Sequence, residues 1–177
     1  GHQMKSNGLS SLFPIEKMSV MGFVEVLKHL RFFKEVEKKV LKTIATEKPE
    51  RIILIDYPGF NLRLAEKIKR KFNIPITYYI SPQIWAWKEK RVNIIKQCVE
   101  QMLVIFPFEK KWYAERGVDV EWVGHPYLEE WKSTPKSELK AELGLDPDKP
   151  LLTLFPGSRK QELDNHLTVC FEAANRV

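Results

Sequence analysis

The sequence is poor in cysteine and has no long apolar run. Its two cysteines, Cys98 and Cys170, are far apart and lack the spacing of metal ligands. A disulfide framework and a zinc site are therefore not expected, and a reducing compartment fits best. No apolar run approaches the ~20 residues that a membrane-spanning helix needs, and no signal peptide is recognisable. Any contact with a membrane is expected to be peripheral.

The rest of the composition is that of a folded protein. Of 177 residues, 44% are hydrophobic and 29% are charged, with 11 prolines and 8 glycines, which excludes a disordered or low-complexity chain. The formal net charge is +6. A basic surface can attract nucleic acid, anionic lipid headgroups or phosphorylated substrates, and the charge alone does not choose among them.

Segments typical of strands and helices alternate along most of the chain. Apolar residues recur at helical spacing over 20–47, where Lys48 and Pro49 end the helix. Further helices are predicted over 62–72, 92–99 and from 107 to about 117, and strands over 51–56, 76–80, 102–106 and 120–123. The first of these strands is predicted to be buried. This order predicts an α/β fold with a Rossmann-like parallel sheet, which binds ligands beyond the carboxyl ends of its strands.

The pattern changes after residue 127. We interpret 128–149 as a charged linker with one short helix over 136–143, and 151–155 as the strand that opens a second domain. A helix is predicted from about residue 160. The predicted organisation is thus a first lobe over 1–127, a linker over 128–149 and the start of a second lobe over 150–177. Because the chain begins with Gly1 and Val177 lies inside the last predicted helix, we expect it to be truncated at both ends.

Asp56 and Asn61 flank the loop after the first predicted strand. A carboxylate at the carboxyl end of a parallel strand can act as a general base or bind a sugar hydroxyl, although a turn-forming Asp is common there. Asn61 is expected to be the N-cap of the next helix. His125 is more easily explained as a structural histidine than as a catalytic one.

The loop after the second predicted strand, Ser81–Lys88, contains Trp85 and Trp87. Indole rings stack on sugars and their N–H groups donate hydrogen bonds, but either ring could instead fill the core.

A phosphate-binding pattern follows the 151–155 segment. Gly157 allows a sharp turn, Ser158 lies at the start of a helix whose free N–H groups favour an anion, and Arg159 can grip a diphosphate. Glu162 could contact a donor sugar or ribose, or could simply be a favourable acid in a first helical turn.

The 20–47 helix interleaves apolar and basic residues, a pattern typical of helices at a membrane interface. Packing on the sheet would explain most of the same apolar face. The interfacial candidates are Phe23, Val24, Leu27, Leu30, Arg31 and Phe33.

Seven stretches together resemble the lipid-A-disaccharide synthase family, in the family's order. They are Leu12–Glu16, Ser19–Leu27, Ile55–Asn61, Tyr79–Trp87, Phe106–Glu109, Val123–Pro126 and Phe155–Arg159. The Trp-Ala-Trp block is highly specific. The resemblance places the family's opening strand and Gly-rich acidic loop before Gly1, and most of its second lobe after Val177.

The resemblance implies a two-lobed GT-B glycosyltransferase that moves a diacylated glucosamine from UDP to the 6-hydroxyl of a diacylated glucosamine 1-phosphate with inversion. It implies Asp56 as base, Arg159 with the backbone of Gly157 and Ser158 at the leaving diphosphate, and Glu162 in the nucleotide site. The acceptor would contact Asn61, Ser81, Gln83, Trp85 and Trp87. No metal or cofactor is expected. The enzyme would be cytoplasmic and peripheral at the inner face of the inner membrane, and this piece alone is expected to be inactive.

Two other functions stay open at this point. A soluble sugar-nucleotide transferase or epimerase of the same fold would show no dependence on a membrane. A basic α/β module that binds nucleic acid would show salt-sensitive affinity for DNA or RNA. The clustering of apolar residues on one basic helix favours the lipid glycosyltransferase.

Overall fold

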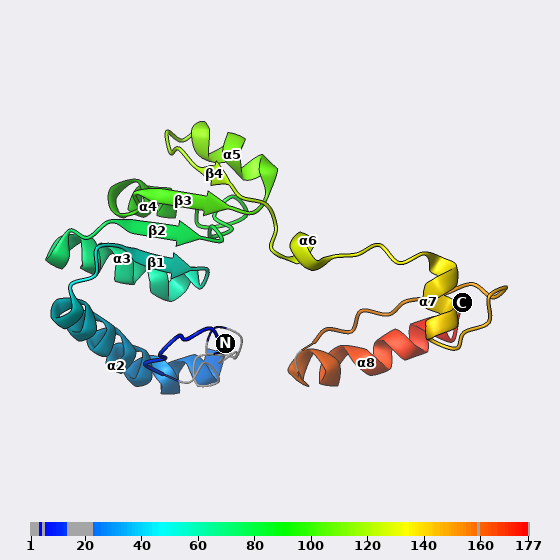
Figure 1. The fold of residues 1–177 in the computed structure, drawn as a ribbon. Helices are drawn as coiled ribbons and strands as arrows, with labels where there is room; N and C mark the ends of the chain where they lie inside the picture. The colour runs from blue at the N-terminus through cyan, green and yellow to red at the C-terminus, as the bar shows by residue number, and fades with distance from the viewer. Residues whose placement is uncertain (1–3, 5, 14–22, 159, 177) are drawn as a thin grey trace. The chain divides into compact units, whose positions relative to one another are not determined.

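The structure is a computed structural model that describes residues 4, 6–13, 23–158 and 160–176 (Figure 1). The chain divides into two compact units, Gly1–Glu130 and Trp131–Val177. The predicted division into two lobes and a linker stays a prediction, because compactness alone does not identify the lobes of an enzyme.

The first unit is built on a four-stranded parallel sheet with the order β1-β2-β3-β4. Its strands are β1 (Ile52–Ile55), β2 (Ile76–Tyr79), β3 (Gln101–Val104) and β4 (Glu121–Trp122). In Figure 1 the arrows lie side by side and point the same way, as the parallel pairing requires. The predicted α/β fold with a Rossmann-like parallel sheet is confirmed. We call the side of the sheet where these strands end the carboxyl edge.

One long helix precedes the first strand, and the other helices connect the strands. They are α2 (Phe23–Glu47), α3 (Pro58–Phe72), α4 (Val92–Cys98) after the 3₁₀ turn η2 (Glu89–Arg91), and α5 (Pro107–Ala114). Helix α2 ends where predicted, since Lys48 has a φ of 46° and Pro49 follows it; residues 20–22 lie outside the described part. Helix α3 begins at Pro58, earlier than predicted, because the fixed φ of proline suits a first helical turn.

The core of this unit is formed by buried side chains from Val36 to Val120. Helix α3 contributes Ala65 and Ile68, and β2 contributes Ile76 and Tyr78, all with no exposed surface. The prediction that the first strand is buried is wrong for one face, since Ile53 and Ile55 are 63% and 44% exposed. The reason is that, in the described part of the chain, only the face of β1 that carries Leu54 is covered.

The second unit contains α7 (Lys136–Glu142) and α8 (Lys160–Ala174), and α6 (Tyr127–Glu130) precedes it. The predicted helix over 136–143 is confirmed. The predicted strand over 151–155 is wrong: these residues are in no strand, and Phe155 is 89% exposed. A strand needs a neighbour to pair with its backbone, and the described part of this unit offers none.

Candidate active site at the carboxyl edge of the sheet

The loops that follow the strands begin at a common level along the carboxyl edge. The N–H of Asp56 donates to the carbonyl of Tyr79 at 2.9 Å, and the N–H of Ile80 donates to Leu103 at 3.1 Å. The N–H of Val123 donates to Val104 at 3.0 Å. Each loop therefore extends the hydrogen-bond ladder by one step before it turns away, which brings residues after β1, β2, β3 and β4 to the same edge.

Asp56 lies where it was predicted, directly after β1, and it is exposed. Asp56 and Tyr57 both have positive φ values, 45° and 48°, a conformation that non-glycine residues adopt only when their surroundings hold it. Two hydrogen bonds to the Asp56 carbonyl stabilise this conformation, one from Asn61 Nδ2 at 2.7 Å and one from the Tyr78 hydroxyl at 2.7 Å. The turn leaves Asp56 exposed at the end of β1.

Asn61 has a different structural role from the one predicted. The N-cap position of α3 is Tyr57, so Asn61 lies inside the first turn and is not the cap. Its Nδ2 also donates to the carbonyl of Ile55 at 3.1 Å. Asn61 thus ties the end of β1 to the start of α3 and fixes the turn at Asp56.

Tyr78 is fully buried beneath this turn. Burial raises the pKa of Tyr78 far above its ordinary value, and the nearby charge of Asp56 raises it further. The hydroxyl therefore stays protonated and can keep donating to the Asp56 carbonyl.

A buried carboxylate, that of Glu109, organises the loop after β2. Glu109 is 1% exposed and Ser81 is 5% exposed. Glu109 Oε1 accepts hydrogen bonds from the Ser81 hydroxyl and from Trp85 Nε1, the latter at 3.3 Å, and Oε2 accepts from the N–H of Phe106 at 3.0 Å. Sequence reasoning missed Glu109, although an acid at the third position of a helix that begins with Pro107 is a recognisable capping signal.

Aromatic side chains form a continuous row along the same edge. Trp85 meets Phe108 edge-on, with ring centroids 5.1 Å apart, and Phe108 stacks on Phe106 at 5.7 Å. Phe106 contacts His125 at 5.7 Å, and His125 stacks on Tyr127 at 5.5 Å. We call these five side chains the aromatic row. Trp85, Phe108 and Tyr127 are 36%, 49% and 82% exposed, so the row offers apolar rings to a ligand.

The two tryptophans of the loop differ in their surroundings. Trp85 joins the aromatic row, whereas Trp87 is 59% exposed and has Lys88 Nζ 4.3 Å from its ring centroid. Neither fills the core. Gln83 is exposed in the same loop, and its backbone carbonyl accepts a hydrogen bond from Ala86 at 3.1 Å.

In the second unit, the conformation of the segment around Gly157 and Ser158, which we call the glycine loop, depends on Gly157 and Glu162. Gly157 has a φ of 108°, and a Cβ there would lie 2.6 Å from Glu162. Glu162 Oε2 accepts a hydrogen bond from the N–H of Ser158 at 3.0 Å. A carboxylate thus binds one of the N–H groups that the sequence assigned to a phosphate, while Arg159 lies outside the described residues.

The interfacial candidates lie on α2. The side chains of Phe23, Val24, Leu27 and Leu30 are outside the described part. Arg31 is 93% exposed, with Glu35 at 3.7 Å. Phe33 instead packs inward, with ring centroids 6.1 Å from Tyr57 and 6.0 Å from Phe60; its half-buried ring supports the fold.

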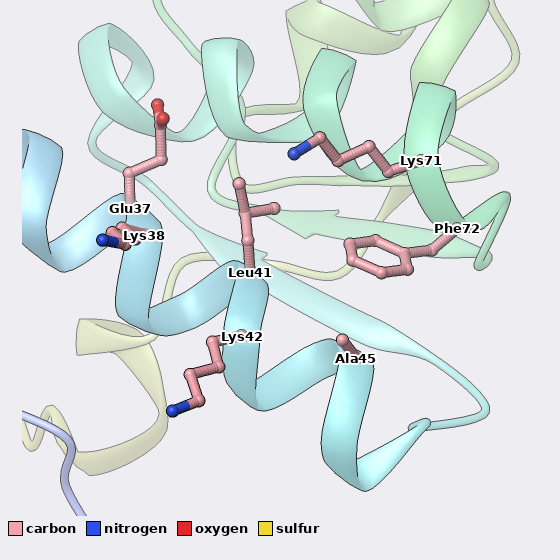
Figure 2. Close-up of a pocket in the computed structure, with 7 residues that line it drawn as sticks. All are labelled: Glu37, Lys38, Leu41, Lys42, Ala45, Lys71 and Phe72. Carbon is pink, nitrogen blue, oxygen red and sulfur yellow. The ribbon is translucent and has the colours of Figure 1, made fainter.

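A separate groove of about 680 Å³ lies between the carboxyl-terminal halves of α2 and α3. Figure 2 shows Phe72 turned toward Leu41, with Ala45 beside them and Lys38, Lys42 and Lys71 around the apolar part. Both helix ends lead into the amino ends of strands, so this groove is remote from the carboxyl edge. Within the described ranges, no group of acidic, histidine or cysteine side chains could hold a metal ion, and no helix there is long and apolar enough to cross a bilayer.

Known proteins match this chain along its full length. The family model for lipid-A-disaccharide synthetase covers residues 1–177. Lipid-A-disaccharide synthase from Nitrosococcus oceani is 43% identical over 178 residues, which is 100% of this chain and 46% of the relative. Lipid-A-disaccharide synthase 1 from Legionella pneumophila strain Philadelphia 1 is 40% identical over 98% of this chain and 46% of its own length. The Coxiella burnetii Dugway enzyme is 37% identical over 100% of this chain and 47% of its own.

The chain therefore spans about half the length of the curated relatives it matches. The match includes the carboxyl edge of the sheet and the glycine loop, the two places where polar and aromatic groups gather. From its sequence and its fold, this chain belongs to the lipid-A-disaccharide synthetase family.

Proposed function

We propose that the whole protein, of which this chain spans a part, is a glycosyltransferase that makes the lipid A disaccharide. It transfers a 2,3-diacylglucosamine from UDP to 2,3-diacylglucosamine 1-phosphate, forms a β-1,6 bond and releases UDP. The observation that carries the proposal is the family match over residues 1–177. The names of the relatives support synthesis of the disaccharide, and the finer substrate assignment rests on the resemblance of the motifs.

The proposed reaction is one in-line displacement. The oxygen of the acceptor 6-hydroxyl attacks C1 of the donor sugar while the bond from C1 to the β-phosphate oxygen breaks, and that electron pair leaves with UDP. Asp56 takes the hydroxyl proton. Its place supports this role: it is exposed at the end of β1 on a turn fixed by Asn61 and Tyr78.

The glycine loop would stabilise the leaving diphosphate. The N–H groups of Gly157 and Ser158 and the guanidinium of Arg159 suit the charge that develops on UDP. Glu162, which accepts from the N–H of Ser158, would exchange that bond for a contact with the ribose when a phosphate binds.

The acceptor would lie along the carboxyl edge. Trp85 offers an exposed ring for the sugar, and Trp87, Gln83 and Ser81 belong to the same loop. Asn61 contributes by fixing the turn at Asp56.

Acylated substrates reside in a bilayer, which supports peripheral binding through the amino-terminal half of α2. We assign Phe23, Val24, Leu27, Leu30 and Arg31 to this interface at the inner face of the inner membrane, in the cytoplasm. The packing of Phe33 on Tyr57 and Phe60 leaves that residue to the fold. The proposed reaction needs acceptor-binding groups of the first lobe and donor-binding groups of the second. We therefore expect this chain alone to be inactive.

The test uses a full-length enzyme that carries this segment and measures UDP release from UDP-2,3-diacylglucosamine with the acylated acceptor. Asp56→Asn should lower kcat by about 10²–10⁴-fold, the usual effect of losing a general base, with little change in the donor KM. Asp119→Asn is the matched control, because Asp119 is exposed just before β4, at the opposite edge. If the folded parent shows no turnover, the proposed substrates are wrong. If Asp56→Asn turns over at the parent's rate, Asp56 is not the general base.

A further inference from the structure

Glu109 is the only acidic residue with a buried side chain in the part of the chain whose side chains are described. Burying a carboxylate is costly unless it is well hydrogen-bonded, and an apolar side chain of similar size often gives equal or greater stability. A buried acid is therefore poor evidence of a purely stabilising role. What the carboxylate holds in place is the more informative observation.

The partners of Glu109 come from two separate segments, the loop after β2 and the end of β3. Ser81 follows β2, Trp85 lies in the loop beyond it, and Phe106 follows β3. The N–H of Glu109 in turn donates to the carbonyl of Phe106 at 3.2 Å. Phenylalanine has no side-chain acceptor, so this backbone bond and the Oε2 bond together fix the start of α5. One buried carboxylate thus joins two adjacent strand ends.

The same carboxylate reaches the aromatic row at two places. It accepts from the indole N–H of Trp85, whose ring is 36% exposed, and from the backbone of Phe106, two members of the row. Phe108 lies between them and contacts both rings. Trp85 is therefore positioned by one hydrogen bond to the Glu109 carboxyl group and one ring contact with Phe108.

Tyr113 completes the buried surroundings. It is fully buried beside Ser81 and Glu109, and its hydroxyl has no hydrogen bond of standard geometry in the described structure. Burial raises the pKa of Tyr113 far above its ordinary value, and the charge of Glu109 adds to the shift. The Tyr113 hydroxyl therefore stays protonated beside the Glu109 carboxyl group.

We infer that Glu109 is a positioning residue for acceptor binding: it fixes the indole of Trp85 in the aromatic row so that the ring can receive the acceptor sugar. This inference rests on the proposed function for the identity of the acceptor. It assigns no chemical step to Glu109, which acts through Trp85. It predicts that the acceptor KM depends on Glu109 only while the Trp85 N–H is present.

The test is a double-mutant cycle in the full-length enzyme with Glu109→Gln and Trp85→Phe. Each single variant should raise the acceptor KM by about tenfold, the effect of one lost hydrogen bond to a charged group, and leave the donor KM unchanged. The double variant should be no worse than Trp85→Phe alone, because both changes remove the same interaction. Glu115→Gln, an exposed acid at the end of α5, is the matched control and should behave as the parent.

Additive effects on the acceptor KM, or loss of thermal stability without any change in that KM, would overturn the inference. If Glu109→Gln does not fold, Trp85→Phe alone still tests the inference. An acceptor KM that is unchanged in Trp85→Phe would overturn the inference as well.

A second readout does not need turnover. In protein labelled with 5-fluorotryptophan, the Trp85 resonance is identified by its absence in Trp85→Phe. It should shift or broaden in Glu109→Gln while the Trp122 resonance stays in place. A displaced resonance in an enzyme that does not use the proposed acceptor would contradict the proposed function and leave the positioning role intact. An undisturbed resonance would contradict the positioning role itself.

Discussion

Residues in unusual backbone conformations occur at both proposed substrate sites. At the carboxyl edge, Asp56 and Tyr57 hold positive φ values that are maintained by the side chains of Asn61 and Tyr78. In the glycine loop, Gly157 has a φ of 108° and lies against Glu162. Strain of this kind persists where the surrounding structure enforces it, and it is common where a chain must present groups to a ligand.

Gly157→Ala should therefore impair donor binding. A Cβ would be strained at this φ and would clash with Glu162 at 2.6 Å, so the loop must change shape. In the full-length enzyme we expect the donor KM to rise by about tenfold, from a cost on the order of 1–3 kcal/mol.

The matched control for Gly157→Ala is Gly144→Ala. Gly144 also has a positive φ, 65°, but a Cβ there would meet nothing within 4 Å. This control should lose about 1 kcal/mol of stability and keep the parent's donor KM. Equal donor KM values for both variants would show that the loop does not shape the donor site.

Two residues of helix α2 differ in their surroundings and separate its role in the fold from its proposed role at a membrane. Phe33 packs on Tyr57 and Phe60, next to the turn that carries Asp56. Arg31 is 93% exposed two positions earlier. Residues two apart on a helix point in different directions, so the same helix can support the sheet with one face and meet a membrane with another.

Phe33→Ala should lower the free energy of unfolding by about 2 kcal/mol, since it removes a half-buried ring, and should leave vesicle binding unchanged. Arg31→Glu should leave stability unchanged and weaken binding to vesicles of anionic phospholipid by about tenfold. Urea unfolding and vesicle sedimentation measure the two effects. Lys96→Glu on α4, another exposed basic position, controls for net charge, and equal binding by Arg31→Glu and the parent would refute the interface.

The alternation of strands and helices was predictable because buried parallel strands are short apolar runs and their crossover helices are amphipathic. Features that depend on which groups meet in the folded chain could not be predicted. Asn61 has the chemistry of a cap, but Pro58 starts α3 earlier and the amide of Asn61 bonds instead to Ile55 and Asp56. Residues 151–155 have the composition of a strand and lack a neighbour to pair with.

The candidate site was predictable to a similar extent. Strand ends identified Asp56, Ser81 and the tryptophan loop, because ligand-binding groups of parallel sheets gather there. Glu109 was missed because its role depends on the meeting of segments 24 or more residues apart in sequence, as its bonds to Trp85 and Ser81 show.

At the scale of the whole molecule, the described hydrophobic core is confined to residues 36–120 of the first unit. Buried Tyr78 and Tyr113 lie in that core, and burial raises the pKa of each far above its ordinary value. In the unfolded chain both phenols titrate near pH ~10. Their contribution to stability is therefore fully present below about pH 10 and is lost as the pH rises further, because only the unfolded state releases the protons.

We expect the free energy of unfolding, measured with urea, to be constant with respect to these groups up to about pH 10 and to fall above it. Tyr78→Phe should make that fall shallower, while lowering stability at neutral pH by about 1 kcal/mol through loss of the bond to the Asp56 carbonyl. Tyr127→Phe, at a position that is 82% exposed, should leave the slope unchanged. The same alkaline slope in the parent and in Tyr78→Phe would contradict the expected shift.

The confinement of the described core to the first unit has a consequence for exchanging segments between relatives. Asp56, Glu109 and the aromatic row all belong to the unit that ends at Glu130, whereas the glycine loop belongs to the other. Recombination between relatives near residue 130 would exchange one proposed substrate site without cutting through the apolar core. The proposed acceptor site and the proposed donor site could then be varied independently of each other.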